Sequence, residues 1–276
     1  MSTEKNHTHG KLFSDIHSSV EKEFFNDDIR VEDDEQTALA REKLNENENY
    51  ENAVNLVSAL SFQLRYRESL ALAERQEKNF QGDYALTRRL GVLYMKTLQF
   101  EKAINKFEKC AKTTDDPLDI FYLLGVNFYY TADYEKAQKY FEKCALLSID
   151  DGEMYVAVLF WTACCLLKQK KSDEKWKPFY ARYDGKSGHH TGYDAFVKAY
   201  AGEITVTQAV KICEDDTDLN KTCLYYGLSV LSRDEKTSRE FLQKTLDLKE
   251  WFGGFAYIAA FGDFQRGSER SGDFRN

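Results

Sequence analysis

The middle of the chain reads YALTRRLGVLYMKTLQFEKAINKFEKCAKTTDDP (residues 84–117) and then LDIFYLLGVNFYYTADYEKAQKYFEKCALLSIDD (residues 118–151). The two 34-residue segments share Leu-Gly-Val, Glu-Lys-Ala and Phe-Glu-Lys-Cys-Ala at equivalent positions. A fixed period of this length indicates a stack of identical supersecondary units, each burying its apolar face against the next. The repeat predicts a scaffold with an extended surface, but it does not say what that surface binds.

Each segment has the pattern of a helix, a short polar turn and a second helix. Apolar residues recur at helical spacing in the first half, as at Leu90 and Tyr94, and in the second half, as at Phe100, Ala103 and Phe107. Only two prolines occur in 276 residues, which favours helices throughout. The expected fold class is therefore all-α.

The 34-residue frame extends beyond these two segments. It fits most clearly at residues 50–83, 84–117, 118–151 and 220–253, and it spans six periods from Tyr50 to Gly253. The fourth and fifth units are degenerate. In that stretch we expect helices at 154–167, 174–183, 193–201 and 205–213, with a loop at 185–192.

Three further local predictions complete the organisation of the chain. Ser232 and Glu235 have the S-x-x-E spacing of a capping box before the last repeat helix. Residues 251–264 are expected to form a capping helix, which a solenoid needs over its last apolar face. We expect an acidic, disordered tail at 1–36, a solenoid at 37–266 and a frayed tail at 267–276.

At these residues the chain resembles the tetratricopeptide repeat (TPR) family. Two consecutive units match the family pattern of small and aromatic residues: Leu90, Gly91, Tyr94, Ala103, Phe107 and Cys110, then Leu124, Gly125, Phe128, Ala137, Phe141 and Cys144. The unit 50–83 departs from it, with Val57 at the glycine position and Ala73 at the large aromatic one. The resemblance implies a right-handed α-solenoid of helix–turn–helix units with a C-terminal capping helix.

The family resemblance also implies a concave groove that binds a peptide or helix. The corresponding positions here are Arg88, Val92, Met95, Lys96, Tyr122, Val126, Tyr129, Tyr130 and Phe160. Aromatic and methionine side chains beside basic residues resemble the rigid anchors and donors of a peptide-binding surface. The alternative is that Phe160 belongs to the core and that Tyr129 or Tyr130 packs inside the stack.

The family's clamp for chaperone C-termini is disfavoured. That clamp uses Lys, Asn and Arg side chains at positions that hold Val54, Ser58, Arg89, Asp119 and Leu123 here. The C-terminal half is also loosely similar to bacterial TPR lipoproteins, through a Trp-containing helix and the segment 200–205 (YAGEIT). The signal and the lipid-attachment cysteine of those proteins are missing, so no membrane anchor is expected.

Composition narrows the class of partner and the compartment. A net charge of −8 argues against nucleic acid, which requires a concentrated basic face. No stretch reaches the roughly 18–20 apolar residues of a membrane span. The six cysteines lack Cys-x-x-Cys or zinc spacing, and Cys110 and Cys144 occupy equivalent repeat positions that suit a small buried residue. We expect free thiols and a cytoplasmic location.

No pattern indicates catalysis, a cofactor or a metal site. His189 and His190, with Asp184 nearby, form the one local cluster of metal-ligating type, but no third ligand follows at helical spacing. We expect these histidines to be solvent-exposed loop residues. No glycine-rich phosphate loop is present, and the paired carboxylates fall at turns, where acids favour the next helix N-terminus.

The sequence therefore predicts a non-catalytic scaffold or adaptor that binds a protein or peptide partner in its concave groove. The acidic tail could occupy that groove in cis, because Arg88, Arg89 and Lys96 offer positive charge. The rival interpretation is a self-associating homo-oligomer that uses the apolar segment 251–264 as its contact.

Overall fold

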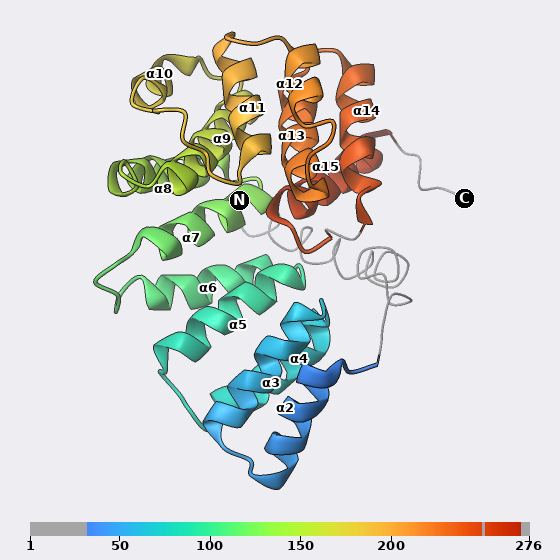
Figure 1. The fold of residues 1–276 in the computed structure, drawn as a ribbon. Coiled ribbons are helices and arrows are strands. Elements are labelled where there is room, and N and C mark those ends of the chain that lie inside the picture. The colour runs from blue at the N-terminus through green and yellow to red at the C-terminus, as the bar shows by residue number, and fades with distance from the viewer. Residues whose placement is uncertain (1–31, 250–251, 272–276) are drawn as a thin grey trace.

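The regular elements of the protein are helices throughout the residues described by the computed structural model, 32–249 and 252–271 (Figure 1). They are α2 (Glu35–Glu46), α3 (Tyr50–Phe62), α4 (Tyr66–Glu77), α5 (Tyr84–Lys96), α6 (Phe100–Cys110), α7 (Leu118–Tyr130), α8 (Tyr134–Leu147), α9 (Gly152–Lys168), η2 (Asp173–Lys175), α10 (Lys177–Tyr180), α11 (Thr191–Ala201), α12 (Val206–Ile212), α13 (Asp218–Leu231), α14 (Glu235–Leu246) and α15 (Phe255–Ser271). The predicted all-α solenoid of helical hairpins is confirmed.

Glycine and phenylalanine fix how the two helices of a hairpin pack. A Cβ atom on Gly91 of α5 would lie 2.5 Å from the ring of Phe107 on α6, and one on Gly125 of α7 would lie 2.7 Å from the ring of Phe141 on α8. Both phenylalanines are fully buried. The aromatic ring therefore fills the space that the missing side chain leaves, which is why the sequence pairs these residues in each unit.

The turns inside the hairpins also repeat. Leu64, Leu98 and Ala132 stand 34 residues apart and have φ values of 61°, 62° and 61°. A left-handed backbone at a residue other than glycine is uncommon, and here it recurs at the same place in three successive units. The three hairpins therefore reverse direction through the same local geometry.

The first helix incorporates part of the predicted acidic tail. Asp34 caps α2 by accepting a hydrogen bond of 2.7 Å from the backbone N–H of Thr37. Asp33 forms ion pairs with Arg41 of α2 and Arg65 before α4. These two acids are thus tied to the first hairpin, whereas residues 1–31 of the predicted tail lie outside the described residues.

The degenerate middle units differ in detail from the sequence prediction. The segment 174–183 forms only η2 and the short α10, and the indole of Trp176 between them is buried and donates a 3.0 Å hydrogen bond to the Leu159 carbonyl. The prediction of a capping box at Ser232 and Glu235 is wrong, because Asp234 caps α14 instead. A capping box occurs at Thr205 and Gln208, at the start of α12.

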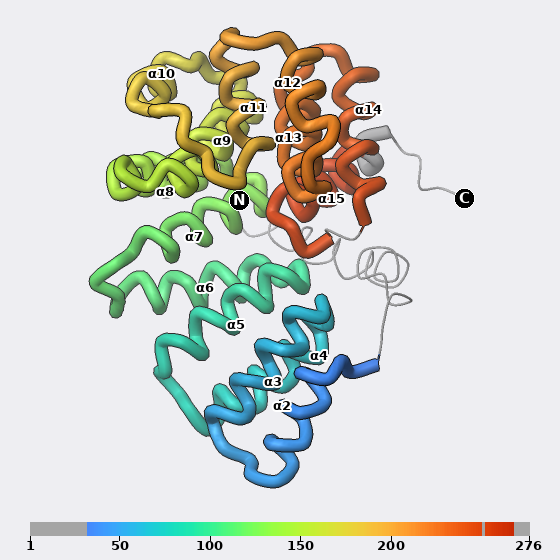
Figure 2. The backbone as a smooth tube through the Cα atoms, viewed as in Figure 1, coloured from blue at the N-terminus to red at the C-terminus, as the bar shows by residue number. Residues whose placement is uncertain are grey.

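The last helix returns into the middle of the molecule. Figures 1 and 2 show the hairpins following one another from α2 at one end to α14 at the other, with α15 turning back toward α7. It contacts α7 as well as α13 and α14. The predicted capping helix 251–264 thus covers the last hairpin and also part of the concave side of the solenoid, which we call the inner face. Residues 250–251 and, in the predicted frayed tail, 272–276 lie outside the described residues.

Candidate functional site

The predicted groove residues lie on α5, α7 and α9, and α15 with the segment before it contacts several of them, including Lys96, Tyr122 and Tyr130. Six of the nine are buried: Met95, Tyr122, Val126, Tyr129, Tyr130 and Phe160. Arg88, Val92 and Lys96 are partly exposed. The role of these residues in binding a partner stays a prediction, and six of them are inaccessible in this structure.

Hydrogen bonds join α7 to the two ends of α15. The hydroxyl of Tyr130 donates to the backbone carbonyl of Phe255 at 3.0 Å, and the guanidinium of Arg266 donates to the carbonyl of Tyr130 at 3.2 Å. The ring of Phe255 also lies against Tyr122, with 5.9 Å between the ring centres. These contacts hold the helix along the inner face.

Lys96 fastens the segment that precedes α15. Its ammonium group donates to the backbone carbonyl of Gly253 and lies 4.6 Å from the centre of the Phe255 ring. Burial lowers the pKa of Lys96 to about 8. A Cβ on Gly253 would lie 2.4 Å from the hydroxyl oxygen of Tyr66, so this segment also packs tightly on the first hairpins.

A partly buried ionic network joins α15 to its neighbours. The carboxylate of Asp263 accepts hydrogen bonds from Lys168 at 2.6 Å, from Arg266 at 2.7 Å and from the hydroxyl of Tyr226 at 2.9 Å. Burial opposes ionisation of Asp263, but the charges of Lys168 and Arg266 outweigh it and hold the pKa of Asp263 below its ordinary value. The network links α9, α13 and α15.

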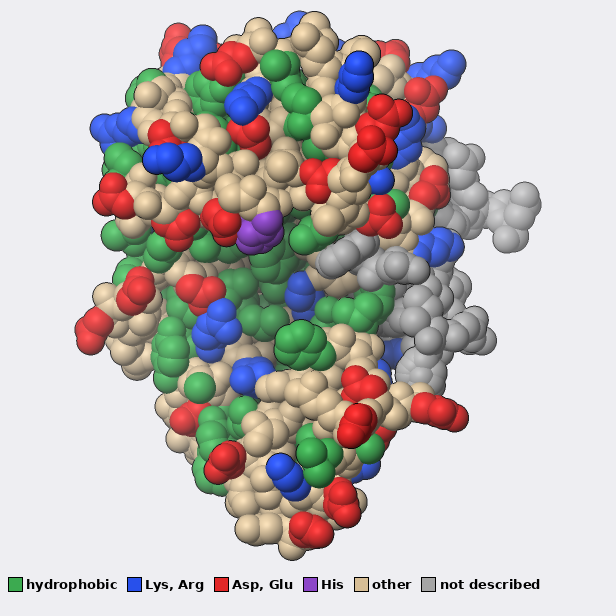
Figure 3. Space-filling model, viewed as in Figure 1, with side chains coloured by type: hydrophobic (Ala, Val, Ile, Leu, Met, Phe, Trp, Pro, Cys, Tyr) green, Lys and Arg blue, Asp and Glu red, His purple; other side chains and the backbone are tan. Residues whose placement is uncertain are grey.

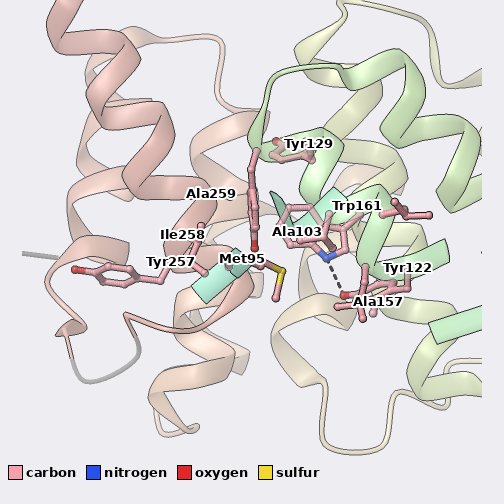
Figure 4. Close-up of a cluster of buried hydrophobic side chains, with 14 of the residues drawn as sticks. Met95, Ala103, Tyr122, Tyr129, Ala157, Trp161, Tyr257, Ile258 and Ala259 are labelled. Carbon is pink, nitrogen blue, oxygen red and sulfur yellow. Dashed lines mark hydrogen bonds between the residues drawn. The ribbon is translucent and has the colours of Figure 1, made fainter. Parts of the chain in front are cut away.

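An aromatic cluster supports the network from α7 and α9. The indole of Trp161 donates a 2.9 Å hydrogen bond to the Tyr122 hydroxyl, and the hydroxyls of Tyr129 and Tyr226 share a hydrogen bond of 2.7 Å. Figure 4 shows Tyr122, Tyr129 and Trp161 in one cluster with Met95 of α5 and with α15. In α15, Ile258 and Ala259 are each 1% exposed. Much of the apolar face of α15 is thus buried within its own chain, and self-association through 251–264 stays a prediction.

An open part of the inner face persists beside the first hairpins. A pocket of about 290 Å³ is lined by Ser61, Tyr66, Tyr84, Ala85, Arg88, Arg89, Val92 and Leu93. In the space-filling view, apolar and basic side chains gather in the hollow between the two halves of the molecule (Figure 3). The pocket thus combines an apolar floor with two guanidinium groups.

The two arginines of this pocket differ in their partners. Arg88 binds both carboxylate oxygens of Asp119, at 2.7 and 2.8 Å. Arg89 donates a 2.7 Å hydrogen bond to the hydroxyl of Ser58 and forms no ion pair with a carboxylate of the described residues. Burial lowers the pKa of Arg89, although an arginine stays charged near neutral pH. Arg89 is therefore a half-buried cation without a carboxylate partner among residues 32–249 and 252–271.

The cysteines are unpaired, as the sequence predicts. All six are free and buried, and burial raises the pKa of the thiols of Cys164 and Cys165 well above the ordinary value. A raised thiol pKa disfavours the reactive thiolate. In the described part of the chain, the side chains that could hold a metal ion are Glu153, His189 and His190. The predicted neighbour Asp184 pairs instead with Lys186.

Helical hairpins nested through glycine–phenylalanine contacts define the chain as a TPR-like α-solenoid. Among solved structures, it is similar to YrrB, "a TPR protein with an unusual peptide-binding site", with a TM-score of 0.47 and 17% identity over 65% of this chain and 94% of that one. It is also similar to a chain of the structure of Naa15/Naa10 bound to HypK-THB, with a TM-score of 0.39 and 16% identity over 96% of this chain and 42% of that one.

No family model matches the sequence, and no curated protein matches it. The described helices include none that is both long and apolar enough to cross a membrane.

Proposed function

We propose that this protein is a non-catalytic scaffold that binds a segment of a partner protein in the open part of its inner face, beside α15. The observation that carries the proposal is the pocket around Arg89. Its cation lacks a carboxylate partner in the described residues, while Tyr66, Val92 and Leu93 provide apolar contact area. A half-buried, uncompensated charge is costly, and a ligand carboxylate would relieve that cost.

The preferred partner segment offers one apolar side chain and one carboxylate. The apolar group would enter the pocket between α3 and α5, and the carboxylate would accept hydrogen bonds from the guanidinium of Arg89. Tyr84 is 38% exposed and provides a rigid aromatic contact at the pocket rim. An extended peptide and an amphipathic helix both meet this description.

In this proposal the predicted groove residues divide into two roles. Arg88 and Val92 line the binding pocket and touch the partner. Tyr122, Tyr129 and Tyr130 lie on the side of α7 that faces α15 and keep it docked, and Met95 and Lys96 support its N-terminal end. Phe160 is a core residue that packs on Tyr193 and Phe196 of α11. In this proposal α15 occupies the part of the inner face where the family resemblance implies a bound peptide.

Selection from a random displayed peptide library tests the proposal with a defined probe. We expect the full chain to enrich peptides that carry an acidic residue near an apolar one, and calorimetry with a selected peptide should give saturable binding. Arg89→Gln and Val92→Glu should each weaken that binding by roughly tenfold, which corresponds to one lost charged or buried contact. Arg239→Gln on the exposed face of α14 is the matched control. Equal binding by all variants would refute the assignment.

A further inference from the structure

The loop before α11 brings two histidines to the first turn of α9. The Nδ1 atom of His189 lies 3.2 Å from a carboxylate oxygen of Glu153, and the rings of His189 and His190 are centred 4.1 Å apart. One ligand atom from each of the three residues lies within 4.8 Å of the other two. Glu153 stands 36 residues before His189, so the fold supplies the third ligand that local spacing lacks.

A buried asparagine on α13 holds this loop in place. The side-chain amide of Asn220 donates a 2.9 Å hydrogen bond to the carbonyl of His189, and its oxygen accepts one of 3.1 Å from the N–H of Gly192. The N–H of His190 donates to the carbonyl of Ser187 at 2.9 Å. The backbone on both sides of the histidine pair is therefore fixed by hydrogen bonds.

Two glycines allow the loop to approach Glu153 closely. Gly188 has a φ of 53°, and a Cβ there would lie 1.7 Å from a carboxylate oxygen of Glu153. A Cβ on Gly152 would lie 2.1 Å from the carbonyl of Lys186. Any other side chain at these positions would push the loop and the carboxylate apart. The three side chains thus converge because of how the backbone is built around them.

We propose that Glu153, His189 and His190 form a binding site for zinc or a similar divalent transition-metal ion. Two imidazole nitrogens and one carboxylate oxygen are ligands that Zn²⁺ prefers, and three protein ligands leave the fourth tetrahedral position for water. The competing explanation is a surface ion pair between protonated His189 and Glu153, both of which are substantially exposed. Such a pair contributes little to stability and requires no metal.

A bound ion would join the loop to α9 at the edge of the inner face. Histidine side chains lie at the rim of the hollow in Figure 3, and the structure describes only His189 and His190 of the five histidines. The ring of His190 is centred 5.4 Å from that of Tyr193, which packs on Phe160 of α9. Metal binding would therefore stabilise the folded chain and fix one rim of the hollow.

Cobalt binding to the full chain tests the site, because tetrahedral Co²⁺ absorbs visible light and zinc does not. The variant His7→Gln/His9→Gln/His17→Gln removes every histidine except His189 and His190. We expect this variant to bind one Co²⁺ saturably with tetrahedral absorption bands, and we expect Zn²⁺ to displace it. Further substitution by Glu153→Gln, His189→Gln or His190→Gln should each weaken the affinity by at least roughly tenfold.

Asp184→Asn in the same background is the matched control, because it alters a neighbouring loop carboxylate that is not a ligand. Circular dichroism of each variant checks that the helices persist. A second readout is the ¹⁵N spectrum of the imidazole rings, in which Zn²⁺ should shift His189 and His190. Absence of saturable Co²⁺ binding, or equal affinity in the ligand variants, would overturn the proposal, as would an equal loss in Asp184→Asn.

Discussion

The hydroxyl of Tyr130 donates a 3.0 Å hydrogen bond to the carbonyl of Phe255, 125 residues further along the chain. Tyr130 is at the end of α7, where the TPR resemblance implies a residue that faces a bound peptide. Phe255 is the first residue of α15, so the hydroxyl of Tyr130 binds a backbone carbonyl of its own chain in place of a peptide. The inner face is therefore divided into a half closed by α15 and an open half around Arg89.

Removal of the Tyr130 hydroxyl should loosen α15 while leaving the hairpins folded. Tyr130→Phe keeps the ring and deletes one hydrogen bond, so we expect a loss of about 1 kcal/mol in the free energy of unfolding. Hydrogen exchange should accelerate in α15 more than in α5 and α6. Tyr84→Phe, which makes the same change at a tyrosine that is 38% exposed, is the control. If α15 exchanged at the same rate in both variants, this hydrogen bond would not contribute to docking.

The Asp263 network should make stability depend on pH. The folded-state pKa of Asp263 lies below its ordinary value of 3.8, so the unfolded chain binds the proton more readily. Its contribution is therefore present above about pH 4 and is lost as the pH falls through the folded-state pKa. We expect the free energy of unfolding to drop more steeply below pH 4 in the natural protein than in Asp263→Asn.

Urea titrations at several pH values measure this difference between the two proteins. Other carboxylates with lowered pKa values, such as Asp33, titrate in both and cancel in the comparison. Parallel curves for the two proteins would mean that Asp263 is not held as an ion by Lys168 and Arg266.

The repeated glycine should tolerate no side chain. Gly91→Ala places a methyl group 2.5 Å from the Phe107 ring, and we expect a destabilisation of about 1–3 kcal/mol. Phe107→Leu in the same chain should recover part of that loss, because the smaller side chain vacates the space. Gly267→Ala, which meets nothing within 4 Å, should be neutral or slightly stabilising. A neutral Gly91→Ala would contradict the close packing inferred for the hairpin.

The acidic N-terminal segment is expected to compete for the open pocket. Residues 21–31 hold four acidic side chains against Lys22 and Arg30. Deletion of residues 2–31 should tighten binding of a selected acidic peptide, and added salt should reduce the difference. The deletion keeps Asp33 and Asp34, which belong to the first hairpin. Unchanged affinity in the shortened chain would exclude competition by this segment.

The sequence predicted the repeated hairpins well because their signals are local. Gly91 with Phe107, and Gly125 with Phe141, meet within one unit, so the 34-residue pattern records the contact directly. The boundaries of α5 and α7 at Tyr84 and Leu118 match the predicted frame. The capping box failed because Asp234, two residues closer to α14, provides the cap instead of Ser232.

The candidate sites were harder to predict because they depend on contacts between distant segments. Nothing near Lys96 in the sequence indicates that its ammonium group binds the carbonyl of Gly253. The pairing of Glu153 with His189 likewise requires the path of the loop between α10 and α11. The exposed pocket could be anticipated only in part, through Arg88 and Val92 at family groove positions.

The docking of α15 has a consequence for how the chain acquires its structure. In an ordinary solenoid each unit touches only its neighbours, so assembly can follow synthesis from the first hairpin onward. Here the carbonyl that binds Lys96 belongs to Gly253, which is synthesised 157 residues later. The aromatic residues of α7 that contact α15 stay exposed to solvent until that helix is made. The nascent chain therefore exposes an apolar surface until α15 has left the ribosome. Products truncated before residue 252 would keep that surface exposed and would be prone to aggregation and degradation.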